Sequence, residues 1–549
     1  MEFISIFNDV LGPVMRGPSS SHTAGSYHIG RLVRSLLGEE PARAAFTFDP
    51  NGSYAATYRQ QGVDLALTAG LLGWPITDER FARALILAPK QGLRPRFRIA
   101  PLKGAGHPNT VAIELAGRSG RKLRATAQSI GGGMVFVTQL DGRPVRLDGK
   151  SYEVLVLVEG RKARAVETIV AADGRMMGRP ARSTEHGQVL LSFKRTAPLG
   201  PEALTAMGRL EGVRGIWAAP PLFFIQEGTP LFQSAAEMVA LARRRGVSLG
   251  RIALAYEAQL LGLGEAEILG EMGRRFDIMS KSVRRGLAGR GLGMKILKPT
   301  AGRIFRAEAR RDLPAGGFHT RAAARAMAAL HVSNSGGIVL AAPTGGSAGV
   351  LPGVVVTLVE EGRLDGESTA LALLAAAAVG TIIARRATFA AEVAGCQVEI
   401  GAAGAMAAAA VVEAAGGSAA RAADAAAVAL QNTMGSVCDL VQGLCEIPCH
   451  TRNAVAASSA FVCADLVLGG YRNPVPLDET IDASFSSGRM LPAELRCTAL
   501  GGLAVTPSAL ALRASSPPAP AGPGCAACTR SRRSRRRRPR TAPARASAA

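Results

Sequence analysis

Three of the eight cysteines stand among polar residues that would suit a metal site. Cys396, Cys438 and Cys449 are separated by 42 and 11 residues, a spacing typical of neither zinc fingers nor ferredoxins. Their polar neighbours carry more information, because such groups tune a bound cation and hold a carboxylate. These neighbours are Gln397, Glu399, Asp439, Thr451, Arg452 and Asn453. In a reducing compartment, clustered cysteines favour metal ligation or catalysis over disulfides, so the three predict a metal centre that faces a substrate.

Three polar loops precede these cysteines, and each lies outside any periodic element. GPSSSHT (17–23) opens a helical pattern, and its hydroxyl and free N–H groups suit a carboxylate or a phosphate. A helix cap and nothing more is the alternative. HPNT (107–110) holds a histidine and an asparagine in an extended segment around a proline. SIGGG (129–133) either allows a ligand to approach the backbone closely or forms a plain turn.

The elements that must position these groups predict an α+β fold. Residues 1–145 mix short β-like runs with glycine-rich loops, which indicates an α/β domain. Residues 146–225 alternate strands and helices, with one strand unclear, and resemble a small ferredoxin-like or ACT regulatory module. Residues 226–507 show helical periodicity almost throughout and predict a helical catalytic domain. Residues 508–549 are rich in Pro, Ala and Arg, and we expect a disordered tail.

Composition excludes several classes of protein. The chain has 549 residues, of which 48% are apolar and 19% charged, so neither a small disulfide scaffold nor a disordered protein is expected. The net charge is +23, and nine arginines with no acid lie between residues 530 and 549. No uninterrupted apolar run reaches the roughly 20 residues that a membrane span needs. With no leader recognised either, we expect a cytoplasmic protein.

Several sequence strings together resemble one enzyme family, the iron–sulfur-dependent L-serine dehydratases, whose β and α segments would here be fused in one chain. The resemblance covers roughly residues 1–507. The strings that carry it are GPSSSHTAG, HPNT, SIGGG, APTGGSAGVLPG, GCQVEIGAAGAMAAAAVVEAAGG, MGSVCD, IPCHTRNA and TALGGLAVTP. The serine-rich loop and the three cysteines in their contexts are its most specific parts.

The resemblance implies that Cys396, Cys438 and Cys449 hold a [4Fe-4S] cluster, which the GPSSSHT and HPNT loops face across a domain interface. Three thiolates on four irons leave one iron without a protein ligand, free to act as a Lewis acid on the carboxylate and hydroxyl oxygens of the substrate. The implied reaction removes water from L-serine and yields pyruvate and ammonia. The implied substrate-binding residues are Ser19, Ser20, Ser21, Thr23, Asn109, Thr110, Arg452 and Asn453.

The sequence departs from the family pattern at the expected base. Where relatives usually read His-Gly-Thr-Asp, this chain has QGVD at 61–64, and a glutamine accepts no proton usefully. Either His22 or His107 is then the catalytic base, or turnover is weak, or the substrate is another β-substituted amino acid such as threonine, cysteine or a modified serine.

The remaining cysteines have weaker assignments. Cys445 and Cys463 are expected to be core thiols, and Cys497 has no assigned role. In many relatives a C-terminal cysteine caps the open iron, but the sequence diverges after TALGGLAVTP, so Cys525 and Cys528 stay unassigned.

Two hypotheses from other classes remain open. The arginine-rich tail could bind nucleic acid in a salt-sensitive way, and Lys281 could carry pyridoxal phosphate. We expect a small amino-acid substrate as the partner, no specific nucleic acid and no membrane. A homodimer is expected by analogy.

Overall fold

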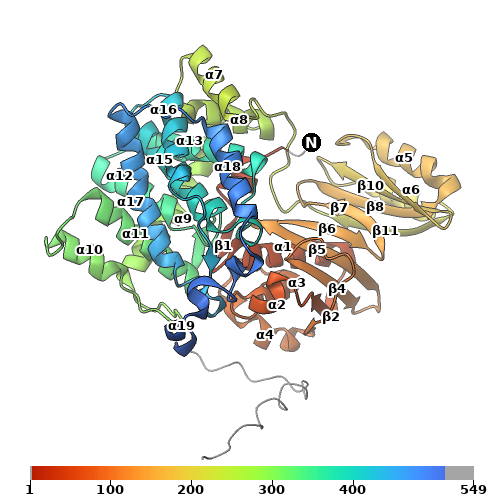
Figure 1. Ribbon diagram of the computed structural model, residues 1–549. Coiled ribbons are helices and arrows are strands. Elements are labelled where there is room, and N and C mark those ends of the chain that lie inside the picture. Colours follow the sequence, from red (N-terminus) through yellow and green to blue (C-terminus); the bar gives the residue numbers. More distant parts are fainter. Residues whose placement is uncertain (1–2, 513–549) are drawn as a thin grey trace, which may run out of the picture.

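A computed structural model of the chain describes residues 3–512. Strands dominate the first two fifths of that span and helices the remainder, as Figure 1 shows. The arginine-rich segment, Cys525 and Cys528 lie outside the described residues. The predicted combination of a sheet-containing N-terminal region and a helical C-terminal region is confirmed.

The first sheet has six strands in the order β3-β2-β4-β5-β6-β7, and only β2 and β3 run parallel. Its strands are β2 (Pro41–Phe48), β3 (Arg94–Ile99), β4 (Thr110–Gly117), β5 (Lys122–Gly131), β6 (Met134–Leu140) and β7 (Arg143–Leu147). Two helices, α1 (Gly25–Leu37) and α3 (Val63–Leu72), bury their apolar residues against one face in a shared core. The short helices α2 (Ser53–Thr57) and α4 (Ala84–Leu87) complete this part.

The second sheet has four antiparallel strands in the order β11-β8-β10-β9, with two helices packed on one face. In chain order its elements are β8 (Tyr152–Glu159), α5 (Ala163–Ala172), β9 (Ala181–Glu185), β10 (Gln188–Arg195), α6 (Pro201–Arg209) and β11 (Val213–Ala219). β9 is the strand that the sequence left unclear. It lies at the sheet edge and is largely exposed, so it has no apolar alternation to reveal it.

Helices build the rest of the described chain. They are α7 (Ala235–Arg245), α8 (Leu249–Leu261), α9 (Glu265–Ala288), α10 (Ala301–Ala309), α11 (Phe318–Asn334), α12 (Val350–Gly362), α13 (Gly366–Arg386), α14 (Ala391–Ala394), α15 (Ile400–Ala414), α16 (Ala419–Gln431), α17 (Cys449–Leu468), α18 (Leu477–Arg489) and α19 (Pro507–Ala511). Three short strands interrupt them: β12 (Ile338–Leu340), β13 (Cys438–Asp439) and β14 (Arg496–Thr498). α13 begins after a capping residue, because Asp365 accepts a hydrogen bond from Ser368 N at 2.7 Å.

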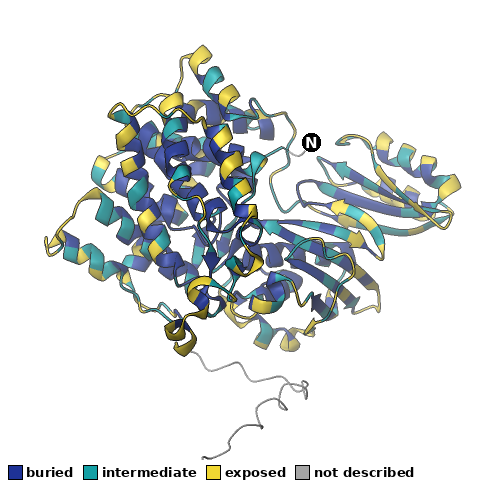
Figure 2. Ribbon diagram, viewed as in Figure 1, coloured by how far each residue is buried: buried dark blue, intermediate teal, exposed yellow. Residues whose placement is uncertain are grey.

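Alanine-rich helices form the centre of the helical region, as the dark ribbons of Figure 2 show. Small side chains let α13 and α15 pack closely. The segments Gly366–Arg386 and Cys396–Ala414 are long and apolar enough to cross a membrane. Their most apolar windows, however, are 78% and 89% buried inside the protein, as in the core helices of a folded domain.

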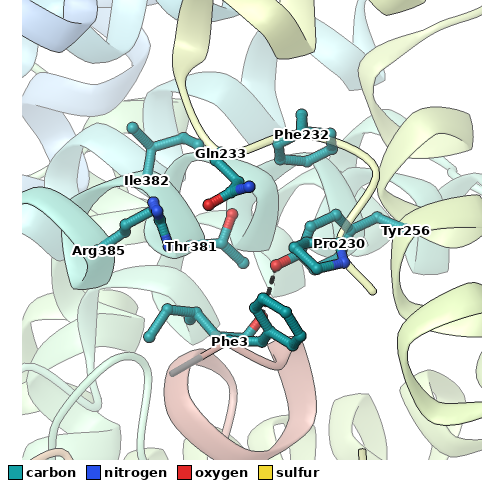
Figure 3. A pocket seen from close by; sticks show the side chains of 9 residues that line it. Phe3, Pro230, Phe232, Gln233, Tyr256, Thr381, Ile382 and Arg385 are labelled. Carbon is teal, nitrogen blue, oxygen red and sulfur yellow. Dashed lines mark hydrogen bonds between the residues drawn. The ribbon is translucent and has the colours of Figure 1, made fainter. Parts of the chain in front are cut away.

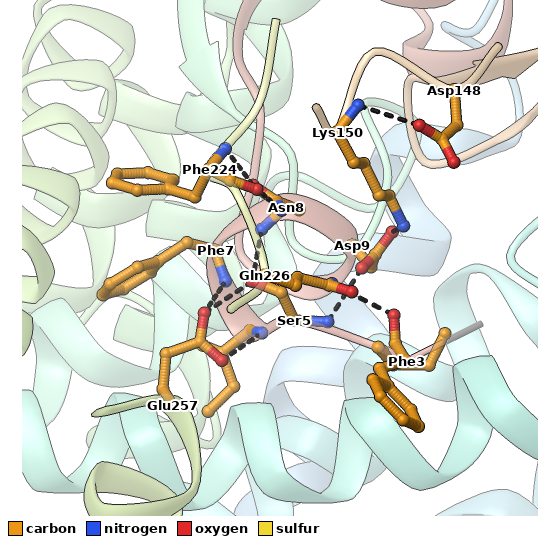
Figure 4. Close-up of polar contacts among 12 residues, drawn as sticks. Phe3, Ser5, Phe7, Asn8, Asp9, Asp148, Lys150, Phe224, Gln226 and Glu257 are labelled. Atoms are coloured by element: carbon orange, nitrogen blue, oxygen red, sulfur yellow. Dashed lines mark hydrogen bonds and ion pairs between the residues drawn. The ribbon is translucent and has the colours of Figure 1, made fainter. Parts of the chain in front are cut away.

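The first residues of the chain pack into the helical region. Ile6–Val10 form a single wide turn in its core, and β1 (Val14–Arg16) pairs antiparallel with β12. Glu257 of α8 holds the start of the turn, because its carboxylate accepts hydrogen bonds from Ile6 N at 2.8 Å and Phe7 N at 3.0 Å (Figure 4). Beside it, a small cavity is lined by Phe3, Tyr256 and Arg385, among others (Figure 3).

Candidate active site

The GPSSSHT loop forms the first turn of the helix that covers the six-stranded sheet. Ser20–Ala24 make one wide turn that runs directly into α1. Ser19 caps this turn, since its Oγ accepts a hydrogen bond from His22 N at 3.2 Å. The three serines are buried. The expectation that this loop opens a helix is confirmed, and N–H groups at a helix start favour an anion.

Both ring nitrogens of His22 have hydroxyl partners. Nδ1 lies 3.0 Å from Ser21 Oγ, and Nε2 lies 3.1 Å from Ser53 Oγ. Burial lowers the pKa of His22 to about 4, so the ring is neutral at pH 7. Thr23 Oγ1 donates a hydrogen bond to the Gln61 carbonyl at 2.8 Å, which ties the loop to the position where the family pattern is broken.

Gln61 lies where the two halves of the chain meet. Its side chain is fully buried, and its Nε2 donates a hydrogen bond to the Gly443 carbonyl at 3.5 Å. Gly443 belongs to the segment between Cys438 and Cys449. Within residues 3–512, Gln61 Oε1 has no hydrogen-bond partner. A buried acceptor without a partner is rare in folded proteins, and this one is available to a ligand.

The HPNT segment reaches the helical half through its asparagine. Asn109 Nδ2 donates a hydrogen bond to Glu392 Oε1, and Asn109 N donates to His107 Nδ1 at 3.1 Å. Thr110 Oγ1 donates to the His107 carbonyl at 2.6 Å, so that hydroxyl shapes the segment. Burial lowers the pKa of His107, and its ring is therefore also neutral at pH 7.

Five buried thiols lie near one another in the helical half, and we call this group the thiol pocket. Cys396 interacts with Cys438, and Cys449 lies close enough to act electrostatically on Cys396. The folded chain thus brings the three predicted ligands together. It also adds two thiols, because Cys497 interacts with Cys438 and Cys445 with Cys449. Cys463 is buried but has a different neighbour, with its sulfur 3.8 Å from Ser459 Oγ.

Arg452 organises the segments that carry the thiols. It donates to the Val437 carbonyl at 2.6 Å and to Asp439 Oδ1 at 3.0 Å, and its Nη1 lies 3.6 Å from Cys396 Sγ. The other Asp439 oxygen accepts from Leu503 N at 2.8 Å. The parallel pairing of β13 with β14 brings Cys497 beside Cys438. A single guanidinium thereby links three distant segments and places a positive charge beside sulfur.

Asn453 has all of its side-chain groups engaged with backbone. Nδ2 donates to the carbonyls of Gly346 at 2.8 Å and Cys449 at 2.9 Å, and Oδ1 accepts from Gly349 N at 3.1 Å. These bonds hold the APTGGSAG loop against the start of α17. This arrangement favours a positioning role for Asn453 over direct contact with a substrate.

Two glycines let the halves of the chain approach each other at the site. A Cβ atom on Gly131, which has φ +101°, would lie 2.9 Å from Ala390 N. A Cβ atom on Gly345 would lie 2.7 Å from Ser20 N. The SIGGG loop therefore allows a close approach of backbone to backbone, next to the segment that carries Glu392. The atoms that approach the loop belong to the protein itself. The alternative that a ligand approaches the SIGGG backbone stays a prediction.

Besides Asp439, two acidic residues of the helical half enter the site, and the sequence indicated only one of these two. Glu399 was noted beside Cys396, and one of its oxygens lies within 4.8 Å of the Cys396 and Cys438 sulfur atoms. Glu392 was missed, although an acid four residues before a candidate ligand was a usable signal. Ser53 was missed as well, because no feature of the sequence connects α2 with His22.

The residues present fit a thiolate-bound metal group. Sulfur donors are soft ligands that suit such groups, and one carboxylate stands beside them. The Cys438 thiol and burial raise the pKa of Cys396 well above its ordinary value. A buried thiol in that position ionises only if a cation supplies the compensating charge, as a coordinated metal does.

Comparison with known proteins agrees with this site. The sequence matches the family described as "Serine dehydratase alpha chain" over residues 226–504. The chain belongs to this family. A relative from Bacillus subtilis (strain 168), "Probable L-serine dehydratase, alpha chain", is 34% identical over 278 residues, which cover 51% of this chain and 93% of the relative. The "L-serine dehydratase, alpha chain" of Peptoniphilus asaccharolyticus is 34% identical over 275 residues, 50% of this chain and 94% of that protein.

The beta chains of serine dehydratases also have a counterpart in this chain. "Probable L-serine dehydratase, beta chain" of Bacillus subtilis (strain 168) is 43% identical over 157 residues, which cover 29% of this chain and 69% of the relative. Segments similar to both chains of the serine dehydratases are thus fused in one polypeptide, as the sequence motifs predicted.

The structure does not support the hypothesis that Lys281 binds pyridoxal phosphate. Lys281 lies on α9 with its side chain exposed to solvent. A lysine that binds pyridoxal phosphate needs an enclosing pocket.

Proposed function

We propose that this protein is an L-serine dehydratase, a lyase that converts L-serine into pyruvate and ammonia. The observation that carries the proposal is a group of buried thiols close to a serine-rich helix start, in a chain that belongs to the serine dehydratase alpha chain family. Ser53 links the two, because its hydroxyl lies 3.1 Å from His22 Nε2 and donates to the Cys497 carbonyl at 3.4 Å. Serine has a carboxylate and a hydroxyl, and this pair of groups matches a site with N–H donors on one side and a metal group on the other.

For the cofactor we propose a [4Fe-4S] cluster held by Cys396, Cys438 and Cys449. When bound, it supplies a Lewis acid through the iron that has no protein ligand. The thiol donors, their apolar surroundings and the Arg452 charge beside Cys396 support this assignment.

The chain's own residues would orient the substrate. The N–H groups and hydroxyls of Ser19, Ser20, Ser21 and Thr23 are suited to hold the carboxylate at the start of α1, with Arg452 contributing charge. Fixing the carboxylate in this way aims the Cα–H bond at a base. The closely packed halves exclude water, because the surrounding polar side chains are buried.

For the base we propose His107 over His22. Both rings are neutral at pH 7 and can accept a proton. The nitrogens of His22 are already bonded to Ser21 and Ser53. His107 accepts from Asn109 N through Nδ1, and Nε2 has no hydrogen-bond partner within the described residues. Removal of the α-proton with loss of the hydroxyl leaves an enamine, which tautomerises to an imine and hydrolyses to pyruvate.

The test is anaerobic purification with analysis of iron and sulfide, followed by a panel of β-substituted amino acids. We expect about four irons per chain and faster pyruvate formation from L-serine than turnover of threonine, cysteine or modified serines. The serine assignment fails if serine is turned over no faster than its analogues. The cluster assignment fails if oxygen-free preparations contain no iron and sulfide.

We further propose that residues 146–225 form an ACT-like regulatory module. The strand order β11-β8-β10-β9, with both helices on one face, supports this interpretation. The domain limits at 145, 225 and 507, a cytoplasmic location and a homodimer stay predictions.

A further inference from the structure

We infer that Glu392 is the counter-ion that binds the α-ammonium group of the substrate. The inference rests on the proposed function for the identity of that substrate. An amino acid enters the site as a zwitterion, and its ammonium group requires a partner as much as its carboxylate does. The serine-rich helix start provides hydrogen-bond donors for the substrate carboxylate. The acceptors for the substrate ammonium group have not yet been assigned.

Glu392 is a buried carboxylate without a compensating cation. Its side chain is 5% exposed, and within residues 3–512 no lysine or arginine forms an ion pair with it. A buried charge with no partner is costly, so buried carboxylates are normally paired or bound to a metal. An ammonium group delivered by a ligand would meet that need.

The neighbours of Glu392 do not supply the missing charge. Within the described part of the chain, its one side-chain hydrogen bond comes from Asn109 Nδ2, a neutral donor. His22 and His107 lie near enough to feel its charge, yet both rings are neutral at pH 7. The second acceptor, Asn109 Oδ1, is buried and has no partner within residues 3–512. The Glu392 carboxylate and the Asn109 amide oxygen are thus two neighbouring acceptors, joined through the hydrogen bond from Asn109 Nδ2. An ammonium group prefers acceptors of these kinds.

The position of Glu392 matches the geometry of an α-amino acid. The ammonium and carboxylate groups of such a molecule are attached to the same carbon, so their partners must lie close together. Glu392 acts electrostatically on His22 of the serine-rich helix start and on Cys497 of the thiol pocket. It therefore lies near both the proposed carboxylate site and the thiols.

Glu399 is less suited to this role. Its Oε1 accepts a hydrogen bond from Thr344 Oγ1 at 2.5 Å, and its carboxylate lies against the Cys396 and Cys438 sulfur atoms. That position favours contact with the metal group. Glu392 has no comparable contact with the three proposed metal ligands.

The test compares two probes that differ in the ammonium group and are not dehydrated. L-alanine and propanoate are titrated calorimetrically into the anaerobic holoenzyme. We expect the wild type to prefer alanine by about 10- to 100-fold, the range for a hydrogen bond to a charged group. Glu392→Gln should bring this preference close to 1, while propanoate binding changes less than alanine binding. Glu392→Asp keeps the charge and should retain part of the preference.

Control variants and turnover separate this inference from its alternatives. Glu413→Gln makes the same chemical change at the far end of α15 and should leave the preference unchanged. A wild type that does not prefer alanine, or a Glu392→Gln variant that keeps the preference but loses only kcat, would overturn the inference. The second result would indicate a base. A wild type that prefers alanine but makes no pyruvate from serine would refute the proposed reaction and leave the ammonium site standing.

Discussion

Polar side chains at the site are held by partners from distant parts of the sequence. His22 is fixed by hydroxyls from its own loop and from α2, and Arg452 bonds to Val437 and Asp439 while contacting Cys396. Such groups exchange water for a few defined partners, so the loss of one partner leaves another unsatisfied. We therefore expect single substitutions of these residues to change cofactor binding and activity more than the free energy of unfolding.

The thiols offer a direct test at this scale. Cys438→Ala should abolish iron and sulfide binding, because it removes a donor that lies between Cys396 and Cys497. Cys463→Ala removes an equally buried thiol outside the pocket and should retain both. We also expect Cys445→Ala to retain both, since Cys445 is not among the proposed ligands. Iron and sulfide analysis of anaerobic preparations measures each outcome, and full iron content in Cys438→Ala would contradict the assignment.

Among the secondary-structure elements, glycine-bearing loops determine how closely the sheet region and the helical region approach. The last residue of β5 lies against the start of α14, and the loop before α12 lies against the helix start at Ser20. Neither approach leaves room for a Cβ atom. The site is consequently an interface between two loops and two helix starts, and its geometry depends on backbone contacts.

Gly131→Ala tests this dependence. The added methyl group would meet Ala390 N at 2.9 Å, and the residue has φ +101°. Gly120→Ala is the matched control, because Gly120 has φ +92° and a methyl group added there would meet no atom within 4 Å. We expect Gly131→Ala to lose about 1–3 kcal/mol more stability than Gly120→Ala and to lower activity. Equal losses in urea unfolding would show that the close contact has no role.

Across the whole molecule, the N-terminal segment connects the three folded parts. Its turn packs in the helical core, β1 pairs with β12, and Asp9 forms a buried ion pair with Lys150 at 2.8 Å, just before β8 (Figure 4). Tyr256 adds a hydrogen bond to the Ile4 carbonyl at 2.6 Å. The small second sheet is thereby attached through the same segment that lies beside the active-site loops.

Glu257, which holds the N-terminal turn through hydrogen bonds to Ile6 N and Phe7 N, should make the stability of the protein depend on pH. Burial raises the pKa of Glu257 to about 7 from an ordinary value of 4.5. Between these values the native state holds a proton that the unfolded state has released, so stability falls as pH rises, by up to about 1.4 kcal/mol per pH unit. The difference in unfolding free energy between wild type and Glu257→Gln should decrease accordingly from pH 4.5 to 7. Denaturant unfolding at several pH values measures it, and a constant difference would refute it.

The sequence alone determined the mixed first part, the helical second half and the choice of the three cysteines that we propose as metal ligands. Periodicity predicts buried helices such as α13, and local motifs such as GPSSSHT predict a helix start. Both kinds of signal depend only on residues that are neighbours in the chain. The strand β9 escaped this reasoning because an exposed edge strand has no apolar pattern.

Only the tertiary structure decided which groups share the pocket. Glu392 meets Asn109, Ser53 meets His22, and Cys497 joins Cys438 through the pairing of β14 with β13. The two residues of each pair are separated by tens to hundreds of positions in the sequence. Helix and strand propensities depend on nearby residues, so they cannot predict these contacts. The contact of Glu392 with Asn109 follows from the packing of the sheet region against the helical region, and the other two contacts follow from folding within one region. In each case burial removes water and leaves the polar group with the partner that the fold provides.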